Sequence, residues 1–221
     1  MRLDRFEIIN EEFRAASITP AQLDMLLADG WRHFGQHFFR YNFGIYEGRI
    51  ERVIPLRICL DRLANSKSQR RTLRRNADLE VRFGPPAIDA EVHDLFARHK
   101  QRFRTGVPDD IFDFIPRGGS PTEIYQFTVL TAGRIVAASF FDVGETSISS
   151  IYGIFDPSES TRGLGIFTML KEIEFARHRG KSLYYHGYAY EGESYYDYKK
   201  RFSGLEAFDW SGGWHPFTDK P

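Results

Sequence analysis

The sequence predicts an α+β fold: a mixed, largely antiparallel sheet flanked by helices, with a small N-terminal α+β lobe. Three segments with the alternation of β-strands follow one another at residues 124–130, 135–143 and 146–155. An amphipathic helix comes next, and a further strand at residues 182–190 ends the series. Because a helix separates the last two strands, they can lie parallel to each other in one sheet.

The composition is that of a soluble globular protein with a sizeable core. Hydrophobic residues make up 42% and aromatic residues 15% of the 221 residues, which excludes wholesale disorder, a collagen and a coiled coil. No apolar run is long enough to span a membrane, and residues 1–10 do not resemble a signal peptide. We therefore expect a cytoplasmic protein with no membrane partner.

The residue counts also restrict the chemistry. Cys59 is the only cysteine, so neither an internal disulfide nor a thiolate metal cluster is expected. Spacings typical of metal ligands, of a P-loop, of a dinucleotide fingerprint or of a nucleophile elbow are absent, and we expect no metal and no cofactor. The 30 basic and 30 acidic residues balance, so any attraction to nucleic acid must be local.

The N-terminal lobe is expected to hold a short helix and a β-hairpin. Thr19 is placed to cap a helix whose first position is Pro20. Residues 36–46 and 49–60 are rich in aromatic and β-branched residues, and a short turn containing glycine separates them. This pattern predicts the two strands of a hairpin. Pro55 indicates an edge strand or a bulge.

A basic helix is expected at residues 66–76. Ser66 and Gln69 have the spacing of a capping box, and Asn76 can end the helix. One face of it carries five cations: Lys67, Arg70, Arg71, Arg74 and Arg75. A polyanion could offset their mutual repulsion, and neutralising four or five phosphates gives a salt slope of about −3 to −4. The alternative is a solvated helix that pairs with the acidic residues of segment 85–123.

A composition change marks the boundary between two parts of the chain. The Gly-Pro-Pro sequence at residues 84–86 separates an N-terminal lobe of residues 1–84, which carries the basic helix, from a second domain of residues 85–221. A helix at residues 92–103 is expected at the start of that domain. The later helix, between the last two strands, ends at Gly180.

The corner between strand 146–155 and the following helix is a candidate anion site. It contains the sequence Arg162-Gly163-Leu164-Gly165. Free backbone N–H groups at a helix N-terminus attract phosphate, and glycines let a ligand approach closely. The alternative is a tight turn without a ligand.

Two further clusters combine aromatic and charged side chains. Tyrosine hydroxyls and lysines beside a sheet, such as Tyr188, Tyr198 and Lys199, can donate hydrogen bonds to a carbonyl or to a leaving oxygen. Packing alone is the alternative for these tyrosines, and a structural histidine is the alternative for the neighbouring His186. In segment 31–41 an aromatic nest holds two arginines and suits either a carboxylate or a hydrophobic plug.

Taken together, these segments resemble the arginyl-tRNA-protein transferases, including their bacterial leucyl-transferring relatives. The resemblance runs in order through nearly the whole chain, and its specific strings are SKSQRRTLRRN at residues 66–76 and YKKRF at residues 198–202. It implies a GNAT-like C-terminal domain that moves an amino acid from the 3′ ester of an aminoacyl-tRNA to the α-amine of a polypeptide. Such acceptors typically begin with Asp or Glu and are thereby marked for degradation.

The resemblance also implies roles for individual residues. The residues expected to contact tRNA are Lys67, Gln69, Arg70, Arg71, Arg74, Arg75, Arg162, Gly163, Gly165 and Arg201. The residues expected near the acceptor are Trp31, Arg32, His33 and Arg40. Asp156 is expected to orient or deprotonate the amine, with an Asp-Pro turn as its alternative role. Tyr188, Tyr198 or Lys199 is expected to stabilise the oxyanion or to protonate the departing ribose oxygen.

One departure from the family pattern bears on the acceptor. Members of the family commonly carry a cysteine cluster where this chain has residues 42–48, which contain no cysteine. A metal or iron–sulfur site is therefore not expected there, and the acceptor can be a protein, a peptide or a small molecule. Two other functions stay open: an acyltransferase that uses acyl-CoA, and an RNA-binding protein without catalytic activity.

Overall fold

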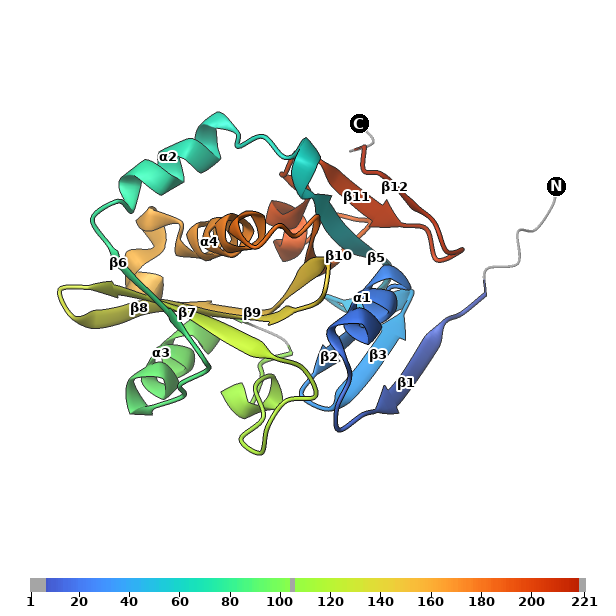
Figure 1. Cartoon of the computed structure of the whole chain (residues 1–221), viewed down its shortest axis with the longest axis horizontal. Coiled ribbons are helices and arrows are strands. Elements are labelled where there is room, and N and C mark those ends of the chain that lie inside the picture. The colour runs from blue at the N-terminus through green and yellow to red at the C-terminus, as the bar shows by residue number, and fades with distance from the viewer. Residues whose placement is uncertain (1–6, 104–105, 219–221) are drawn as a thin grey trace.

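One large mixed sheet organises the molecule. The computed structural model describes residues 7–103 and 106–218 (Figure 1). In these residues nine strands join in the order β12-β11-β5-β10-β9-β8-β7-β6, with β4 paired to β5. Their bounds are β4 (Phe43–Tyr46), β5 (Arg49–Cys59), β6 (Glu80–Gly84), β7 (Ile124–Thr131), β8 (Arg134–Val143), β9 (Ser147–Phe155), β10 (Leu183–Tyr190), β11 (Leu205–Phe208) and β12 (Trp214–Pro216).

Helices cover both faces of this sheet. Figure 1 shows α2 and α4 on one face and α3 on the opposite face. The α-helices are α1 (Pro20–Ala28), α2 (Lys67–Arg75), α3 (Ala90–Lys100) and α4 (Leu164–His178). Four short 3₁₀ helices complete the connections: η1 (Leu60–Arg62), η2 (Ile111–Asp113), η3 (Pro157–Arg162) and η4 (Tyr195–Lys200). The predicted α+β class with a mixed, mostly antiparallel sheet is confirmed.

The parallel pairing that the sequence predicts is present, but it is short. Residues Ser147–Ser149 of β9 pair with Leu183–Tyr185 of β10, and the helix α4 connects the two strands. Beyond that point β9 continues to pair with β8 alone. Strand β10 continues to pair with β5, with a bulge between Tyr185 and Gly187. The two strands therefore separate. We call the region between the diverging segments Ser150–Phe155 and Gly187–Tyr190 the splay.

The predicted strand at residues 36–46 is wrong as a single strand. Its first half is β3 (His37–Tyr41), which lies between β1 (Asn10–Arg14) and β2 (Arg32–Phe34) in a separate three-stranded sheet, and its second half is β4. Buried Asn42 separates the halves, because its side chain accepts from the N–H of Ile9 at 3.0 Å and donates to the carbonyl of Glu7 at 2.7 Å. The predicted hairpin turn between β4 and β5 is confirmed.

Pro55 does not lie at the edge of the sheet, as one of its two interpretations required. Strand β5 is an inner strand, between β10 and β11. Pro55 falls after the residues that pair with β4, which end at Arg52, and before those that pair with β11, which begin at Leu56. Pro55, which has no N–H to donate, therefore lies in the short stretch of β5 between its pairing with β4 and its pairing with β11. The bulge of β10 is close by, since Tyr188 is opposite Pro55.

The strands β5 and β6 belong to the first 84 residues, yet they lie in the large sheet beside strands of the later residues. The division at residue 84 stays a prediction. The predicted capping boxes of α1, at Thr19, and of α2, at Ser66, are both present. Helix α3 ends at Lys100, so Phe103 follows the helix that was predicted to include it.

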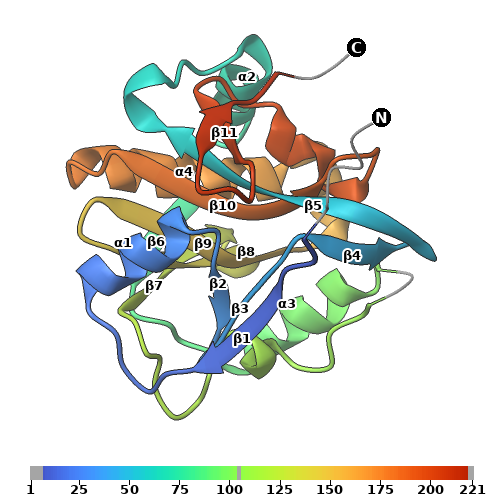
Figure 2. The ribbon, with the colours of Figure 1, turned by 90° about the vertical axis from the view of Figure 1, so that its right-hand side faces the viewer.

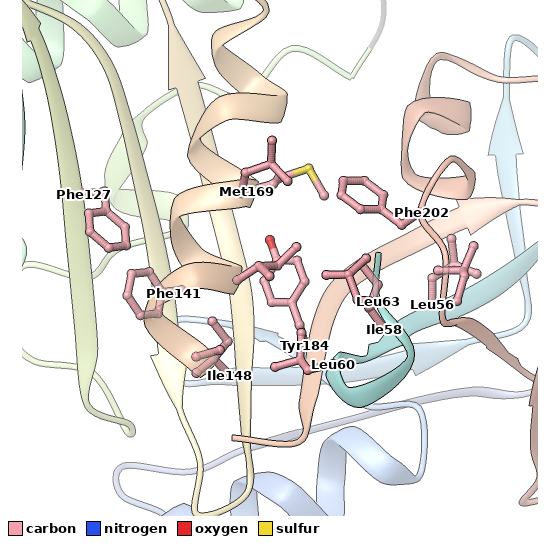
Figure 3. Packing of buried hydrophobic residues seen from close by; sticks show 14 of the residues in the cluster. Leu56, Ile58, Leu60, Leu63, Phe127, Phe141, Ile148, Met169, Tyr184 and Phe202 are labelled. Carbon is pink, nitrogen blue, oxygen red and sulfur yellow. The ribbon is translucent and has the colours of Figure 1, made fainter. Parts of the chain in front are cut away.

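The main core lies between α4 and the strands β5, β8, β9 and β10. Tyr184 is completely buried there with Ile58, Phe141 and Ile148. Figure 3 shows its ring among these side chains, with the hydroxyl directed toward α4. A buried hydroxyl needs a partner, and that partner is a carboxylate of α4 described below.

A buried ion pair joins the small sheet to the large one, which lie side by side in Figure 2. The Nε2 atom of His33, in β2, lies 2.8 Å from the carboxylate of Asp142, in β8, and its Nδ1 atom lies 2.8 Å from the carbonyl of Gly35. Burial lowers the pKa of His33, but Asp142 outweighs burial and the net pKa is raised. With acceptors at both ring nitrogens, His33 is held as the imidazolium.

This ion pair makes stability depend on pH. Its contribution is complete below about pH 6.5, the unfolded pKa of histidine, and is lost as the pH rises through the higher pKa of folded His33. Asp142→Asn should lower the free energy of unfolding at pH 6 by about 3 kcal/mol and remove this pH dependence, as measured by urea denaturation. The exposed pair between His37 and Glu12 supplies the control, since Glu12→Gln should change stability by less than about 1 kcal/mol. Equal effects of the two variants would show that the buried pair does not stabilise the contact between the sheets.

Candidate functional site

The helix α2 presents a row of exposed cations, as predicted. The side chain of Ser66 accepts from the N–H of Gln69, and the amide of Gln69 accepts from the N–H of Ser66, so the first turn is capped locally. The five basic residues of the helix are all exposed: Lys67, Arg70, Arg71, Arg74 and Arg75. Within residues 7–103 and 106–218, none of them forms an ion pair with a carboxylate. The alternative of pairing with the acidic segment 85–123 is therefore not observed.

The C-terminal end of α2 is fixed against the corner that precedes α4. Asn76 is buried and donates to the carbonyl of Arg162 at 2.9 Å, and Arg75 donates to the carbonyl of Thr161. The guanidinium of Arg162 donates to both carboxylate oxygens of Asp78 at 3.0 Å. A side-chain methyl of Thr72 lies 3.8 Å from the position that a Cβ atom would occupy on Gly163. The cationic helix and the glycine-containing corner thus form one surface.

The other end of α2 meets the segment that follows η4. The amide of Gln69 donates to the carbonyl of Arg201 at 3.3 Å, and the side chain of Arg201 is exposed. Arg201 therefore lies beside the first turn of α2. Gln69, which the resemblance assigns to tRNA, is 5% exposed and supports the helix from beneath.

The corner itself leaves the N-terminus of α4 uncapped by any side chain. Gly163 has φ +67°, which favours glycine, and no acidic residue lies in the first turn of α4. The Cβ position of Gly165 is 3.3 Å from the ring of Phe155, so this glycine allows close packing on β9. The free N–H groups and the positive end of the helix dipole favour an anion here.

Asp156 organises this corner. It is 3% exposed and accepts from Arg134 at 2.7 Å, from Arg98 at 3.2 Å and from the N–H of Ser158 at 3.0 Å. Burial raises the pKa of Asp156, but the hydrogen bonds from Ser158 and Arg134 outweigh it and the net pKa is lowered. A carboxylate held in this way is a weak base, which favours the Asp-Pro turn over deprotonation of an amine.

Two cations meet at the inner end of the splay. Arg32 is 9% exposed and donates to Ser149 Oγ at 2.9 Å and to the carbonyl of Ser150. The Cβ position of Gly187 lies 3.0 Å from Lys199 Nζ and 3.8 Å from an Nη atom of Arg32. In the described part of the chain, neither cation forms an ion pair with a carboxylate. Burial, and then the charge of Arg32, lower the pKa of Lys199 to about 7.

Tyrosines line the rest of the splay. The hydroxyl of Tyr188 donates to the carbonyl of Gly30 at 2.6 Å, so Tyr188 is occupied in holding the small sheet. Burial raises the pKa of Tyr198, and the nearby hydroxyl of Tyr196 raises it further. The Oη of Tyr152 and the Nδ1 of His186 are buried and have no hydrogen-bond partner among the described residues. Neutral phenols of high pKa stay protonated and remain hydrogen-bond donors.

Of the four residues expected near the acceptor, only Arg32 reaches the splay. Arg40 stacks on the ring of Trp31 at 5.0 Å and pairs with Glu11 at 2.6 Å and Asp29 at 2.5 Å. His33 is occupied by Asp142, as described above. Arg40 and His33 thus already have carboxylate partners within the chain.

Sequence reasoning missed two residues of the site, Tyr152 and Glu172. Glu172 lies on α4, is 1% exposed and accepts from the hydroxyl of Tyr184 at 2.7 Å. The spacing held a signal, since Glu172 lies four residues before Ala176 on the apolar face of the helix. Tyr152 begins a segment, residues 152–157, that shares in the family resemblance, but strand alternation does not show that its hydroxyl lacks a partner among the described residues.

No helix among the described residues is long and apolar enough to cross a membrane. No three His, Cys, Asp or Glu side chains in residues 7–103 and 106–218 come together in an arrangement that could hold a metal ion. Cys59 is a free thiol.

Comparison with known proteins identifies the family. The family model described as "Arginine-tRNA-protein transferase, C terminus" matches residues 91–209. The chain is 32% identical over 205 residues to the aspartate/glutamate leucyltransferase of Stenotrophomonas maltophilia (strain K279a), covering 88% of this chain and 80% of that protein. The chain belongs to the arginine-tRNA-protein transferase family. The resemblance inferred from the sequence is therefore confirmed.

Further relatives of this transferase agree. The aspartate/glutamate leucyltransferase of Xanthomonas campestris pv. campestris (strain B100) is 34% identical over 172 residues, which cover 72% of this chain and 68% of that protein. Among solved structures, FemX is similar with a TM-score of 0.51 at 12% identity, covering 83% of this chain and 66% of that chain. This likeness concerns the fold alone, which is GNAT-like, as predicted.

In this transferase, the absence of a side chain at Gly187 should be what allows Lys199 to lie close to Arg32. Gly187→Ala places a methyl group 3.0 Å from Lys199 Nζ at φ +95°, whereas Gly133→Ala meets nothing within 4 Å at a comparable φ of +81°. Gly133→Ala thus measures the backbone strain alone. We expect Gly187→Ala to lower the free energy of unfolding by about 1–3 kcal/mol more than Gly133→Ala, as measured by urea denaturation. Equal losses would show that Gly187 is not tightly packed.

Proposed function

We propose that this transferase moves an aminoacyl group, leucyl or arginyl, from an aminoacyl-tRNA to the N-terminal α-amine of a polypeptide. The observation that carries the proposal is the contact between α2 and the corner before α4: Asn76 and Arg75 bond to the carbonyls of that corner. This contact brings a row of cations, which pair with no carboxylate among the described residues, to one end of the splay. A charged tRNA bound along the row would present its 3′ ester to the splay.

The cationic row supports the RNA part of the proposal. Phosphates would be neutralised by the exposed side chains of α2 together with Arg201. Asp78 partly neutralises the charge of Arg162, so we expect Arg162 to contribute less to tRNA binding than the cations of α2 do. The free N–H groups of the α4 N-terminus offer a further position for a phosphate of the acceptor end.

The splay supports the chemical part. An aminoacyl ester is already activated, so the transfer step needs alignment of the amine and management of its proton. We assign the oxyanion to hydrogen bonds from the hydroxyls of Tyr152 and Tyr198. Lys199, whose pKa is about 7, is suited to protonate the departing ribose oxygen near neutral pH. Tyr188 and Asp156 act by positioning the small sheet and the corner.

Arg32 supports an acidic acceptor. It is a buried cation without a carboxylate partner among the described residues, and an unpaired buried charge is unfavourable unless a ligand pairs with it. Relatives at 31–34% identity are named aspartate/glutamate leucyltransferases. We therefore propose leucine as the preferred donor residue and an N-terminal Asp or Glu as the acceptor, bound through Arg32. Because aminoacyl-tRNA is a cytoplasmic substrate, we place the enzyme in the cytoplasm.

A transfer assay tests this proposal. Labelled leucyl- and arginyl-tRNA are offered with peptides that begin with Asp, Asn or Ala, and we expect transfer of leucine to the Asp peptide. Arg70→Ala with Arg74→Ala should weaken tRNA binding and reduce the magnitude of the salt slope by about 1.4–1.8, according to the strand coefficient that applies. Exposed arginines outside the row supply the control, since Arg49→Ala with Arg82→Ala should leave the slope unchanged. Acetylation from acetyl-CoA without any aminoacyl transfer would overturn the assignment.

A further inference from the structure

The carboxyl group of Glu172 occupies an unusual place for a side chain of a core helix. It lies between α4 and the sheet, where its Oε2 accepts from the hydroxyl of Tyr184 at 2.7 Å. Ser150, on β9, is paired with Phe141 of β8, which packs with α4 in the main core, so the Ser150 side chain lies on the same face of the sheet as α4. Its hydroxyl favours the charged form of Glu172. Glu172 is 1% exposed, and burial of a carboxyl group lowers the stability of the fold. Its presence here therefore points to a function.

Ser150 connects this carboxyl group to the splay. It is the first residue of β9 beyond the residues that pair with β10, because the parallel pairing ends at Ser149. Ser150 is half-buried, and its carbonyl accepts from Arg32. It thus lies at the inner end of the splay, with Glu172 behind it and the cation pair of Arg32 and Lys199 beside it.

We propose that Glu172 is the proton acceptor for the attacking α-amine, with the hydroxyl of Ser150 relaying the proton. This inference rests on the proposed function and adds a residue to it. A group that acts through a serine needs no direct contact with the substrate, which fits the burial of Glu172.

The transfer step needs no co-reactant to supply or remove protons. The neutral amine attacks the ester carbonyl, a C–N bond forms and the nitrogen becomes positively charged. Its proton passes to Ser150 Oγ while the Ser150 proton passes to the Glu172 carboxylate. The C–O bond to the ribose then breaks, and the leaving oxygen takes a proton from Lys199. Protonated Glu172 and neutral Lys199 return to their starting states by exchanging one proton through solvent.

The surroundings of Glu172 suit this task. Burial raises its pKa to about 7, while Tyr184, Ser150 and the charge of Arg32 lower it from a still higher value. Tyr198, on η4, is a further titratable group that faces it. A carboxylate of this pKa is a stronger base than an exposed glutamate, so it accepts the proton of the positively charged nitrogen more readily.

Single-turnover rates with saturating leucyl-tRNA and acceptor test the proposal between pH 5.5 and 8.5. The wild-type rate should rise through an acidic limb near pH 7 as Glu172 loses its proton, and should fall again as Lys199, the acid of the step, loses its own. Glu172→Gln keeps the size of the side chain and should lower the maximal rate by about 100-fold and abolish the acidic limb while the falling limb remains. Ser150→Ala should cause a similar loss. Glu174→Gln, an exposed glutamate on the same helix that pairs with Lys171, is the matched control and should match the wild type.

Tyr184→Phe distinguishes proton transfer from a structural role. The Tyr184 hydrogen bond lowers the pKa of Glu172, so its removal should move the acidic limb to higher pH. A structural role would lower the rate without moving the limb. The inference is overturned if folded Glu172→Gln retains a rate within about threefold of the wild type, or if Tyr184→Phe leaves the limb in place. Absence of transfer by the wild-type protein would instead reject the proposed function.

Discussion

The early separation of β9 from β10 is the constraint on which the site depends. The two strands share only the pairs from Ser147–Leu183 to Ser149–Tyr185. Backbone and hydroxyl acceptors at the end of this pairing hold the guanidinium of Arg32, which comes from the other sheet. The bulge that follows places Gly187, with its positive φ, against Lys199. A continuous parallel ladder would leave room for neither cation.

The outer surface and the inner site are tied together by the corner before α4. Asp156 holds that corner through Arg98 and Arg134, which come from α3 and β8, and Asn76 holds α2 to it. These contacts are partly buried hydrogen bonds. They fix the position of the cationic row relative to the splay. The same fold that exposes charge on α2 buries the charge of Arg32, which has no carboxylate partner among the described residues. The proposed function uses both places to bind negatively charged groups.

The sequence allowed local features and the order of elements to be predicted. The caps at Thr19 and Ser66, the cationic row and the parallel strand after α4 all follow from patterns within a few residues. The resemblance placed Arg32 near the acceptor, but its burial and contacts could not be predicted, because its hydrogen-bond partner Ser149 is 117 residues away. The break at Asn42 has a similar cause, since it depends on a side chain bonding to backbone more than 30 residues earlier. Glu172 was missed because a helical glutamate is normally assigned to the solvent.

The proposed function requires the 3′ end of the tRNA to enter the splay from α2. Photocrosslinking of a tRNA that carries an azido group on its 3′-terminal adenine, followed by peptide mass spectrometry, tests this path. We expect adducts on β9 and η4, at or near Tyr152 and Tyr198, with weaker adducts at the corner around Gly163. Adducts confined to α1 or to the small sheet of β1, β2 and β3 would contradict this path of entry.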